Sequence, residues 1–267
     1  MSEQQIFFKI IYTNLYSQGK LVSPRGFKVL EIENFHVEFP SYYRFINFKS
    51  RKLNLDYIKK EFLWYLNGNK FDLSIVEHAK LWKDMINKEG IIHSNYGQYI
   101  FGENNQFDYV IKTLKEDKDS RRAIISILNK DHVLSKDADL PCTIALSFRI
   151  RNNKLNMSVH MRSQDAIYGL ASDLPCFSFI HEMIYMTLKN DYLDLLIGNY
   201  YHIVDSFHIY SKHFEMLDKI ISQDEFEDLK CPKILNSDEV EFLRKNDFIQ
   251  IPDEFLFAKW LNSYDNK

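Results

Sequence analysis

The sequence of 267 residues has little cysteine, glycine or proline, and it contains no long apolar run. Its three cysteines, Cys142, Cys176 and Cys231, form an odd set without the spacing of a metal site, so we expect neither a disulfide framework nor a bound metal. This cysteine usage indicates a reduced, cytoplasmic setting. No apolar stretch reaches membrane-spanning length. The N-terminal residues include Glu3 and lack a small-residue cleavage site, which argues against a signal peptide.

The sequence also has no large excess of charge of one sign. The 34 Lys and Arg residues are balanced by 37 Asp and Glu residues, which gives a net charge of −3. Without a basic field we expect no nucleic acid as partner. Apolar residues are abundant, at 45% of the chain, with 15% aromatic residues, which is enough for a large core. Because there is no internal repeat, low-complexity segment or linker, we predict a single domain over residues 1–267.

Helical and strand patterns follow one another in irregular order, which predicts an α+β fold. Helical spacing of apolar residues covers residues 5–18, 54–66, 75–87, 107–115 and 174–188. Strand patterns cover two segments within residues 23–40, and residues 123–128 and 192–205. After residue 222 we expect short strands between charged patches.

The central segment, residues 139–173, predicts a β-hairpin with reactive groups at its open end. Apolar residues alternate over 144–150 and 155–161, and Arg-Asn-Asn-Lys between them supplies the turn. Cys142 precedes the first strand, whereas Arg162 and Ser163 follow the second, so an antiparallel pairing makes them neighbours. The arginine would favour the Cys142 thiolate, and with the serine hydroxyl it would bind an anion. Taken alone, a free cysteine is more often a small buried side chain.

A glutamate and three further arginines each have two interpretations. Glu61 lies beside the apolar stripe of residues 54–66; it is either a boundary residue with its carboxylate in water, or a buried group whose raised pKa would let it move protons. Arg25, on a Pro-Arg-Gly turn, is either solvated or a ligand for an anion. The adjacent Arg121 and Arg122, at the start of a strand, have the same two interpretations.

His208 and Tyr210 lie two residues apart, so on an extended segment they face the same way. They are either satisfied core groups or a binding pair. With Cys142, Glu61 and the arginines, they would form a site for a small anionic molecule. The residues by themselves indicate a thiol-dependent transferase that acts on a phosphorylated substrate.

Six stretches, in their order and spacing, resemble the thymidylate synthase superfamily over most of the chain: EFLWYLNGN (61–69), SNYGQYI (94–100), DSRRAIIS (119–126), LPC (140–142), MRSQDAIYGL (161–170) and HIYSKH (208–213). The resemblance implies that superfamily's layered α+β fold, with a mixed β-sheet packed by helices and one sheet face at a homodimer interface. It also implies a pyrimidine nucleoside monophosphate as substrate and 5,10-methylenetetrahydrofolate as carbon donor.

The resemblance assigns roles to individual residues. Cys142 matches the nucleophile that adds to pyrimidine C6 and thereby activates C5, and Glu61 matches the glutamate that organises water and relays protons. The other matched residues are contacts to phosphate within the subunit (Arg25, Arg162, Ser163), to phosphate across the dimer interface (Arg121, Arg122), to the rest of the nucleotide (Gln164, His208, Tyr210) and to the folate (Trp82, Tyr96, Asp165).

At Asp173 the sequence departs from the family pattern, and this departure bears on which pyrimidine base is bound. The methylating synthases carry Asn where this chain has Asp173, and an Asn amide donates to uracil O4 and accepts from N3–H. A carboxylate would repel O4, whereas it can share a proton with cytosine N3 and accept from the N4 amino group. That proton would also offset the electron density that thiolate attack pushes into the ring. Asp173 is therefore a third candidate catalytic residue, and it favours dCMP.

Two further departures concern the product. Thr143 after the nucleophile and Ser206 before His208 resemble the phage-type deoxycytidylate hydroxymethylase branch, in which water adds to the C5 methylene and tetrahydrofolate leaves. The end of the chain, LNSYDNK, lacks the small apolar residues that close the synthase site. We therefore predict 5-hydroxymethylation of dCMP. The alternatives are a methylating synthase acting on dUMP or dCMP, a CMP hydroxymethylase, a non-catalytic nucleotide- or RNA-binding relative, and a redox role for Cys142.

Overall fold

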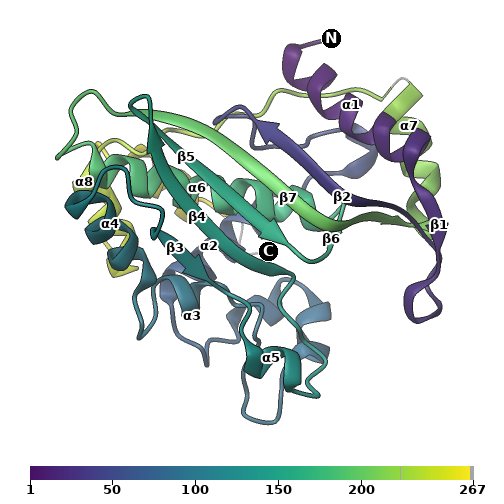
Figure 1. The fold of residues 1–267 in the computed structure, drawn as a ribbon, viewed down its shortest axis with the longest axis horizontal. Coiled ribbons are helices and arrows are strands. Elements are labelled where there is room, and N and C mark those ends of the chain that lie inside the picture. Colours follow the sequence, from purple (N-terminus) through teal and green to yellow (C-terminus); the bar gives the residue numbers. More distant parts are fainter. Residues whose placement is uncertain (223, 265–267) are drawn as a thin grey trace.

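The structure, a computed structural model, describes residues 1–222 and 224–264. Its centre is a mixed sheet in the order β1-β2-β7-β5-β4-β3, with β6 paired to β7 (Figure 1). The strands β5 and β6 run parallel to β7, and the other neighbours are antiparallel. The strands are β1 (Lys20–Val22), β2 (Val29–Phe39), β3 (Ile124–Ser126), β4 (Thr143–Arg151), β5 (Lys154–Met161), β6 (Gln164–Asp165) and β7 (Leu196–Tyr210). This confirms the predicted α+β class with a mixed sheet.

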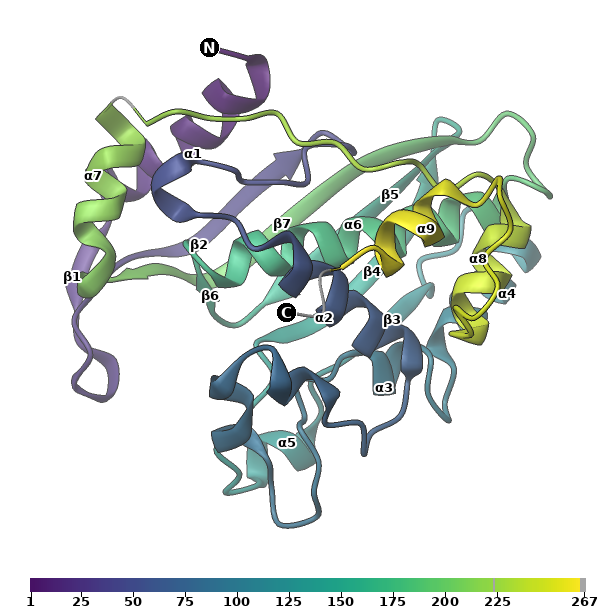
Figure 2. The same cartoon turned by 180° about the vertical axis from the view of Figure 1, so that it is seen from behind.

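Helices pack on one face of this sheet. They are α1 (Glu3–Gln18), α2 (Leu55–Asn67), α3 (Gly97–Ile100), α4 (Gln106–Glu116), α5 (Lys130–Leu134), α6 (Gly169–Leu188), α7 (Phe214–Ser222), α8 (Ser237–Lys245) and α9 (Leu256–Asn262). Figure 2 shows α6 lying against the sheet with α2 packed on it, and Figure 1 shows the opposite, uncovered face of β4, β5 and β7. The α6 helix is apolar on almost every side because it contacts α2, α4 and α8 as well as the sheet.

Local signals explain the two elements that carry the predicted catalytic groups. The α2 helix begins where the Asn54 side chain accepts from the backbone N–H of Tyr57, and it ends at Gly68, which has a φ of 63°. The β4–β5 turn places Asn152 and Asn153 at φ values of 51° and 55°, the left-handed conformation that a tight hairpin turn requires. The predicted hairpin is therefore confirmed, including its turn.

Four predicted elements differ in the structure. Residues 75–87 form two short 3-10 turns, Ser74–Glu77 and Lys80–Met85, because Ala79 between them is extended. Residues 29–39 form one strand, and not two, with Asn34 in the left-handed conformation inside it. The segment after residue 222 contains α8 and α9 where short strands were predicted. The α6 helix begins at Gly169 and not at the predicted residue 174, so Asp173 lies inside the helix.

Residues 265–267, the last three of LNSYDNK, lie outside the described residues. The prediction that this end lacks the apolar residues that close the synthase site therefore stays a prediction. Within the described part of the chain, no helix is long and apolar enough to cross a membrane.

Candidate active site

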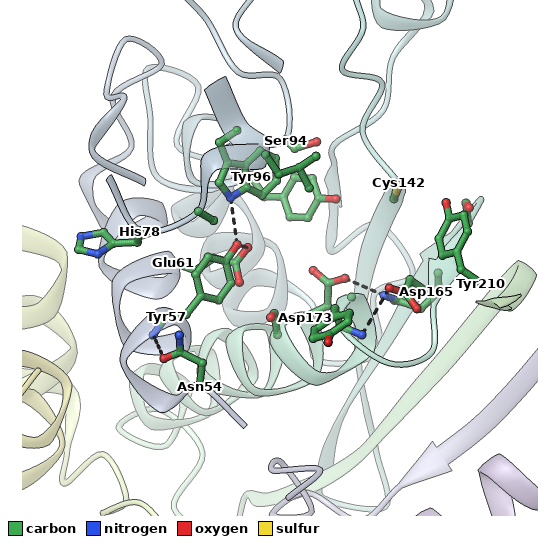
Figure 3. A pocket seen from close by; sticks show the side chains of 18 of the residues that line it. Asn54, Tyr57, Glu61, His78, Ser94, Tyr96, Cys142, Asp165, Asp173 and Tyr210 are labelled. Carbon is green, nitrogen blue, oxygen red and sulfur yellow. Dashed lines mark hydrogen bonds between the residues drawn. The ribbon is translucent and has the colours of Figure 1, made fainter. Parts of the chain in front are cut away.

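A cavity of about 610 Å³ lies at the open end of the β4–β5 hairpin (Figure 3). It is bounded by α2, by the start of α6 and by the ends of β6 and β7. The predicted site residues that line it are Arg25, Glu61, Trp82, Tyr96, Cys142, Arg162, Ser163, Gln164, Asp165, Asp173, His208 and Tyr210. Residues up to 185 positions apart in the sequence, Arg25 and Tyr210, therefore face one space. Its volume suits a small molecule of nucleotide size.

Cys142 and Arg162 are neighbours, as the hairpin predicts. The backbone N–H of Arg162 donates to the Cys142 carbonyl at 2.9 Å, and Arg162 Nη2 lies 3.7 Å from Cys142 Sγ. The same guanidinium donates to the carbonyl oxygens of Leu140 and Pro141 at 2.7 and 3.0 Å. Burial raises the pKa of the Cys142 thiol, and the Arg162 charge opposes that rise without cancelling it. The arginine therefore supports the thiolate, but the net pKa lies above its ordinary value.

Glu61 is buried, at 4% exposed, which decides between its two interpretations. Its Oε1 accepts from the hydroxyls of Tyr57 and Tyr65 at 3.2 and 3.4 Å, and Trp82 Nε1 donates to the Tyr57 hydroxyl at 3.0 Å. Burial, together with the nearby Asp173, raises the pKa of Glu61 to about 8. Oε2 has no hydrogen-bond partner among the described residues. This carboxyl can therefore exchange protons near neutral pH.

Asp173 lies in the second turn of α6 and faces the cavity (Figure 3). Gln164 Nε2 donates to Asp173 Oδ2 at 2.9 Å, and burial raises the pKa of Asp173 to about 7. Gln164 is itself only 2% exposed. A Cβ atom at Gly169 would lie 2.6 Å from Gln164 Nε2, so glycine is required there for the amide to keep this place. The pair thus presents a carboxyl that can hold a proton at neutral pH.

The strand β6 brings a second group of residues to the cavity. Asp165 pairs with His208 across β6 and β7, and the His208 and Tyr210 rings lie 5.2 Å apart in an edge-to-face arrangement. His208 and Tyr210 line the same side, as their spacing predicts. The Asp165 carboxylate accepts from the backbone N–H groups of Ile167 and Tyr168 at 3.0 and 3.4 Å. It thereby holds the turn before α6, and its contact with a folate stays a prediction.

The three arginines outside the hairpin are placed differently. Arg25 is exposed at the cavity mouth, in a turn where its own φ is 53°. Arg121 and Arg122 are exposed residues just before β3, and they do not line the cavity. Their contact with a phosphate would need a second subunit and stays a prediction.

Several lining residues were missed by sequence reasoning. Tyr57 and Tyr65 lie four residues before and after Glu61, a helical spacing that could have identified them. Arg51 gives no such signal, yet it is buried and lines the cavity. Its Nε donates to the Ile167 carbonyl at 2.8 Å, while Nη1 has no hydrogen-bond partner among the described residues. Only the tertiary structure brings this cation to the site.

The geometry defines an α+β protein with a small-molecule site that combines a thiol, two carboxyls of raised pKa and several arginines. A sequence model of thymidylate synthase matches residues 8–251, and the chain therefore belongs to the thymidylate synthase family. The predicted family and its fold are thus confirmed. Among the described residues there is no cluster of three or more His, Cys, Asp or Glu side chains that could hold a metal ion.

Individual relatives share about three residues in ten with this chain. The deoxyuridylate hydroxymethyltransferase of Bacillus phage SP01 is 29% identical over 222 residues, which cover 77% of this chain and 56% of that protein. The deoxycytidylate 5-hydroxymethyltransferase of Enterobacteria phage T4 is 31% identical over 175 residues, covering 62% of this chain and 71% of that protein. The thymidylate synthase of Fusobacterium nucleatum is 29% identical over 195 residues, covering 72% and 68%.

The chain thus spans little more than half the length of the phage SP01 relative. The three relatives are named for different bases and products, at nearly equal identity. Family membership alone therefore does not select the substrate.

Proposed function

We propose that this protein transfers a one-carbon unit from 5,10-methylenetetrahydrofolate to C5 of dCMP and adds water, which yields 5-hydroxymethyl-dCMP and tetrahydrofolate. The observation that carries the proposal is the carboxyl of Asp173, which has a pKa of about 7 and is held by Gln164 in the cavity that Cys142 lines. A carboxyl with one proton can donate to cytosine N3 and accept from the N4 amino group.

In the proposed mechanism the Cys142 thiol gives its proton to water and Sγ forms a bond to C6 of the base. Asp173 keeps a proton at N3, so the electron pair displaced from the ring double bond reaches C5 without a net charge on the ring. C5 would then bond to the methylene carbon of the co-substrate and lose its own proton, the bond from that carbon to the folate nitrogen would break as tetrahydrofolate leaves, and water would bond to the carbon. Glu61, with a pKa of about 8, accepts and returns protons at the ring and at the entering water. Expulsion of Cys142 Sγ restores the double bond.

A second base, uracil, is favoured by the name of the phage SP01 relative, a deoxyuridylate hydroxymethyltransferase. A protonated Asp173 with its hydrogen on the opposite oxygen would donate to uracil O4 and accept from N3–H. The Gln164 amide acts against this arrangement, because its hydrogen bond lowers the pKa of Asp173 and so favours the ionised carboxylate, which repels uracil O4. For that reason dCMP is the first choice.

The test is to incubate purified protein and 5,10-methylenetetrahydrofolate with dCMP, CMP or dUMP in turn, and to identify the nucleotide product by mass spectrometry. We expect hydroxymethylated dCMP without the absorbance rise that dihydrofolate formation produces. Turnover of dUMP alone would contradict the base, and dihydrofolate formation would contradict hydration. Cys142→Ala is the matched control: it should bind dCMP and release no product. No turnover of any nucleotide by the wild type would favour a non-catalytic binding protein.

We also propose that the protein is a homodimer joined through the uncovered sheet face. Along β7 on that face, Ile203 is 39% exposed and Asp205 is exposed, while the alternate residues Tyr200, His202 and Val204 are buried against the helices. The family to which the chain belongs, together with the lack of a described helix over this face, supports the proposal. In such a dimer, Arg121 and Arg122 of one subunit would extend toward the phosphate in the other.

A further inference from the structure

The segment that carries Cys142 is held from two sides. Arg162 lies on one side and donates to the two carbonyl groups that precede Cys142. On the other side lies the loop 93–96, where Ser94 engages the side chain of Asp139. The backbone N–H of Ser94 donates to Asp139 Oδ2 at 2.7 Å, and its hydroxyl donates to Oδ1 at 2.6 Å. Both carboxylate oxygens are thus fixed by one residue.

The same loop also contacts the chain beyond the thiol. The hydroxyl of Tyr96 accepts from the backbone N–H of Thr143 at 3.4 Å. Ser94 and Tyr96 therefore contact positions three residues before and one residue after Cys142. Both also line the cavity, so the loop is placed against the nucleotide site and the nucleophile together.

Burial of the Asp139 carboxylate carries a free-energy penalty. Asp139 is 5% exposed, and burial raises its pKa, while the two hydrogen bonds from Ser94 act in the opposite direction. Withdrawing a charge from water costs several kcal/mol unless it is fully hydrogen-bonded, and an apolar side chain would pack there at lower cost. The carboxylate fixes the orientation of the Asp139 side chain, because two charge-assisted hydrogen bonds from one residue restrict it.

We propose that Ser94 and Asp139 are positioning residues that form a clasp, which sets the place of Cys142 Sγ for attack on the nucleotide. The proposal rests on the proposed function, because it takes Cys142 as the nucleophile. Nucleophilic attack needs the reacting atoms aligned at close range, and small displacements of the sulfur cost large factors in rate. An outer contact, His93 Nε2 to Asp137 Oδ2 at 2.8 Å, supports the same segment two residues earlier.

The Asp139 charge also acts on the pKa of the Cys142 thiol, which can be measured separately from activity. The Asp139 charge raises the pKa of the Cys142 thiol, whereas the Arg162 charge lowers it. Asp139→Asn keeps the shape and an acceptor for Ser94 but removes the charge. Asp139→Ala removes both, and Ser94→Ala removes only the hydroxyl. The three variants therefore separate alignment from charge.

The test measures two properties of each variant: kcat and KM for dCMP, and the pH profile of Cys142 alkylation by iodoacetamide, followed by peptide mass spectrometry. The control is Asp224→Asn. Asp224 accepts from the backbone N–H of Ser50 at 3.0 Å and from its hydroxyl, so it too is held by one serine, but it does not line the cavity. Thermal unfolding verifies that each variant is folded.

We expect Asp139→Ala to lower kcat about tenfold or more with KM for dCMP changed less than about threefold. Ser94→Ala should lower kcat less. Asp139→Asn should recover most of kcat and shift the alkylation midpoint to lower pH, and Asp224→Asn should change neither property. If Asp139→Ala does not fold, the results with Ser94→Ala and Asp139→Asn decide whether the positioning proposal stands.

Wild-type kcat together with a wild-type alkylation profile in the folded Asp139 variants would overturn the clasp. Alkylation needs no substrate, so it also separates the two proposals. If the wild type does not turn over dCMP but Ser94→Ala, which keeps the Asp139 charge, changes the rate of Cys142 alkylation, the clasp is supported and the proposed function fails.

Discussion

Gln164 donates its side-chain amide to Asp173 Oδ2 across 2.9 Å, and this contact favours the ionised carboxylate, while burial raises the pKa of Asp173 to about 7. Near neutral pH the carboxyl is therefore divided between its two forms. The ionised form repels uracil O4, whereas it can share a proton with cytosine N3 and accept from the N4 amino group. Four predictions follow from this pair and its surroundings.

Asp173→Asn should reverse the choice of base. An amide donates to uracil O4, accepts from N3–H and carries no charge that would repel O4, but it cannot transfer a proton to cytosine N3. Because that proton stabilises the ring during thiolate attack, kcat/KM for dCMP should fall by at least about a hundredfold, while kcat/KM for dUMP rises. Steady-state kinetics with both nucleotides measures this. An unchanged ratio of the two values would show that Asp173 does not contact the base.

Gln164→Leu should weaken discrimination without abolishing turnover. The leucine removes the donor to Oδ2, so the pKa of Asp173 rises further and more of the carboxyl is protonated, the form that can also donate to uracil O4. We expect the ratio of kcat/KM for dCMP to that for dUMP to fall about tenfold. Gly169→Ala should act in the same direction, because its Cβ would lie 2.6 Å from Gln164 Nε2. A retained ratio in both variants would contradict the role of Gln164.

Stability should fall as pH rises through the range in which Glu61 loses its proton. Its folded pKa of about 8 exceeds the ordinary value of 4.5, so the folded state binds the proton more tightly than the unfolded state does. The resulting contribution is complete below about pH 4.5 and is lost by about pH 8; it amounts to at most about 5 kcal/mol.

Urea unfolding at several pH values measures this contribution, and Glu61→Gln should flatten the profile and be relatively more stable at the alkaline end. Asp173, raised from 3.8 to about 7, adds a loss of the same sign over a lower range, so Asp173→Asn should flatten that part. Exposed Glu89→Gln serves as the control, with the wild-type slope. A wild-type slope in Glu61→Gln would contradict a raised pKa at that residue.

Mixed dimers should recover activity that neither parent has. If Arg122 serves the partner's cavity, a dimer of one Cys142→Ala subunit and one Arg122→Ala subunit holds one site with both defects and one with neither. Random mixing should then give about a quarter of wild-type activity, because half of the dimers are mixed and each has one intact site. Co-refolding followed by assay and sedimentation measures this. Recovery no greater than the sum of the parents would place Arg122 outside the neighbouring site.

The sequence alone was sufficient wherever the signal was local. The turn at Asn152 and Asn153, and the alternation on both sides of it, predicted that Cys142 and Arg162 would meet. The apolar spacing over residues 54–66 predicted the helix that carries Glu61. Resemblance of six short stretches predicted the family, which the match over residues 8–251 confirmed.

Local patterns misled where a few residues overrode them. Apolar spacing over residues 75–87 predicted a helix, but Ala79 is extended and divides the segment into two turns. Helical spacing predicted a helix from residue 174, yet α6 begins at Gly169, and this places Asp173 on a helix that faces the cavity. In each case the spacing of apolar residues does not record the backbone conformation of the single residues that decided the outcome.

The sequence by itself determined which reactive groups exist and which of them lie on neighbouring elements, because periodicity, turns and caps act over a few residues. Only the tertiary structure decided that the carboxyls of Glu61 and Asp173 are withdrawn from water, that Arg51 reaches the cavity, and that Ser94 holds Asp139. Burial and these contacts depend on side chains far apart in the chain, and burial is what raises the two carboxyl pKa values.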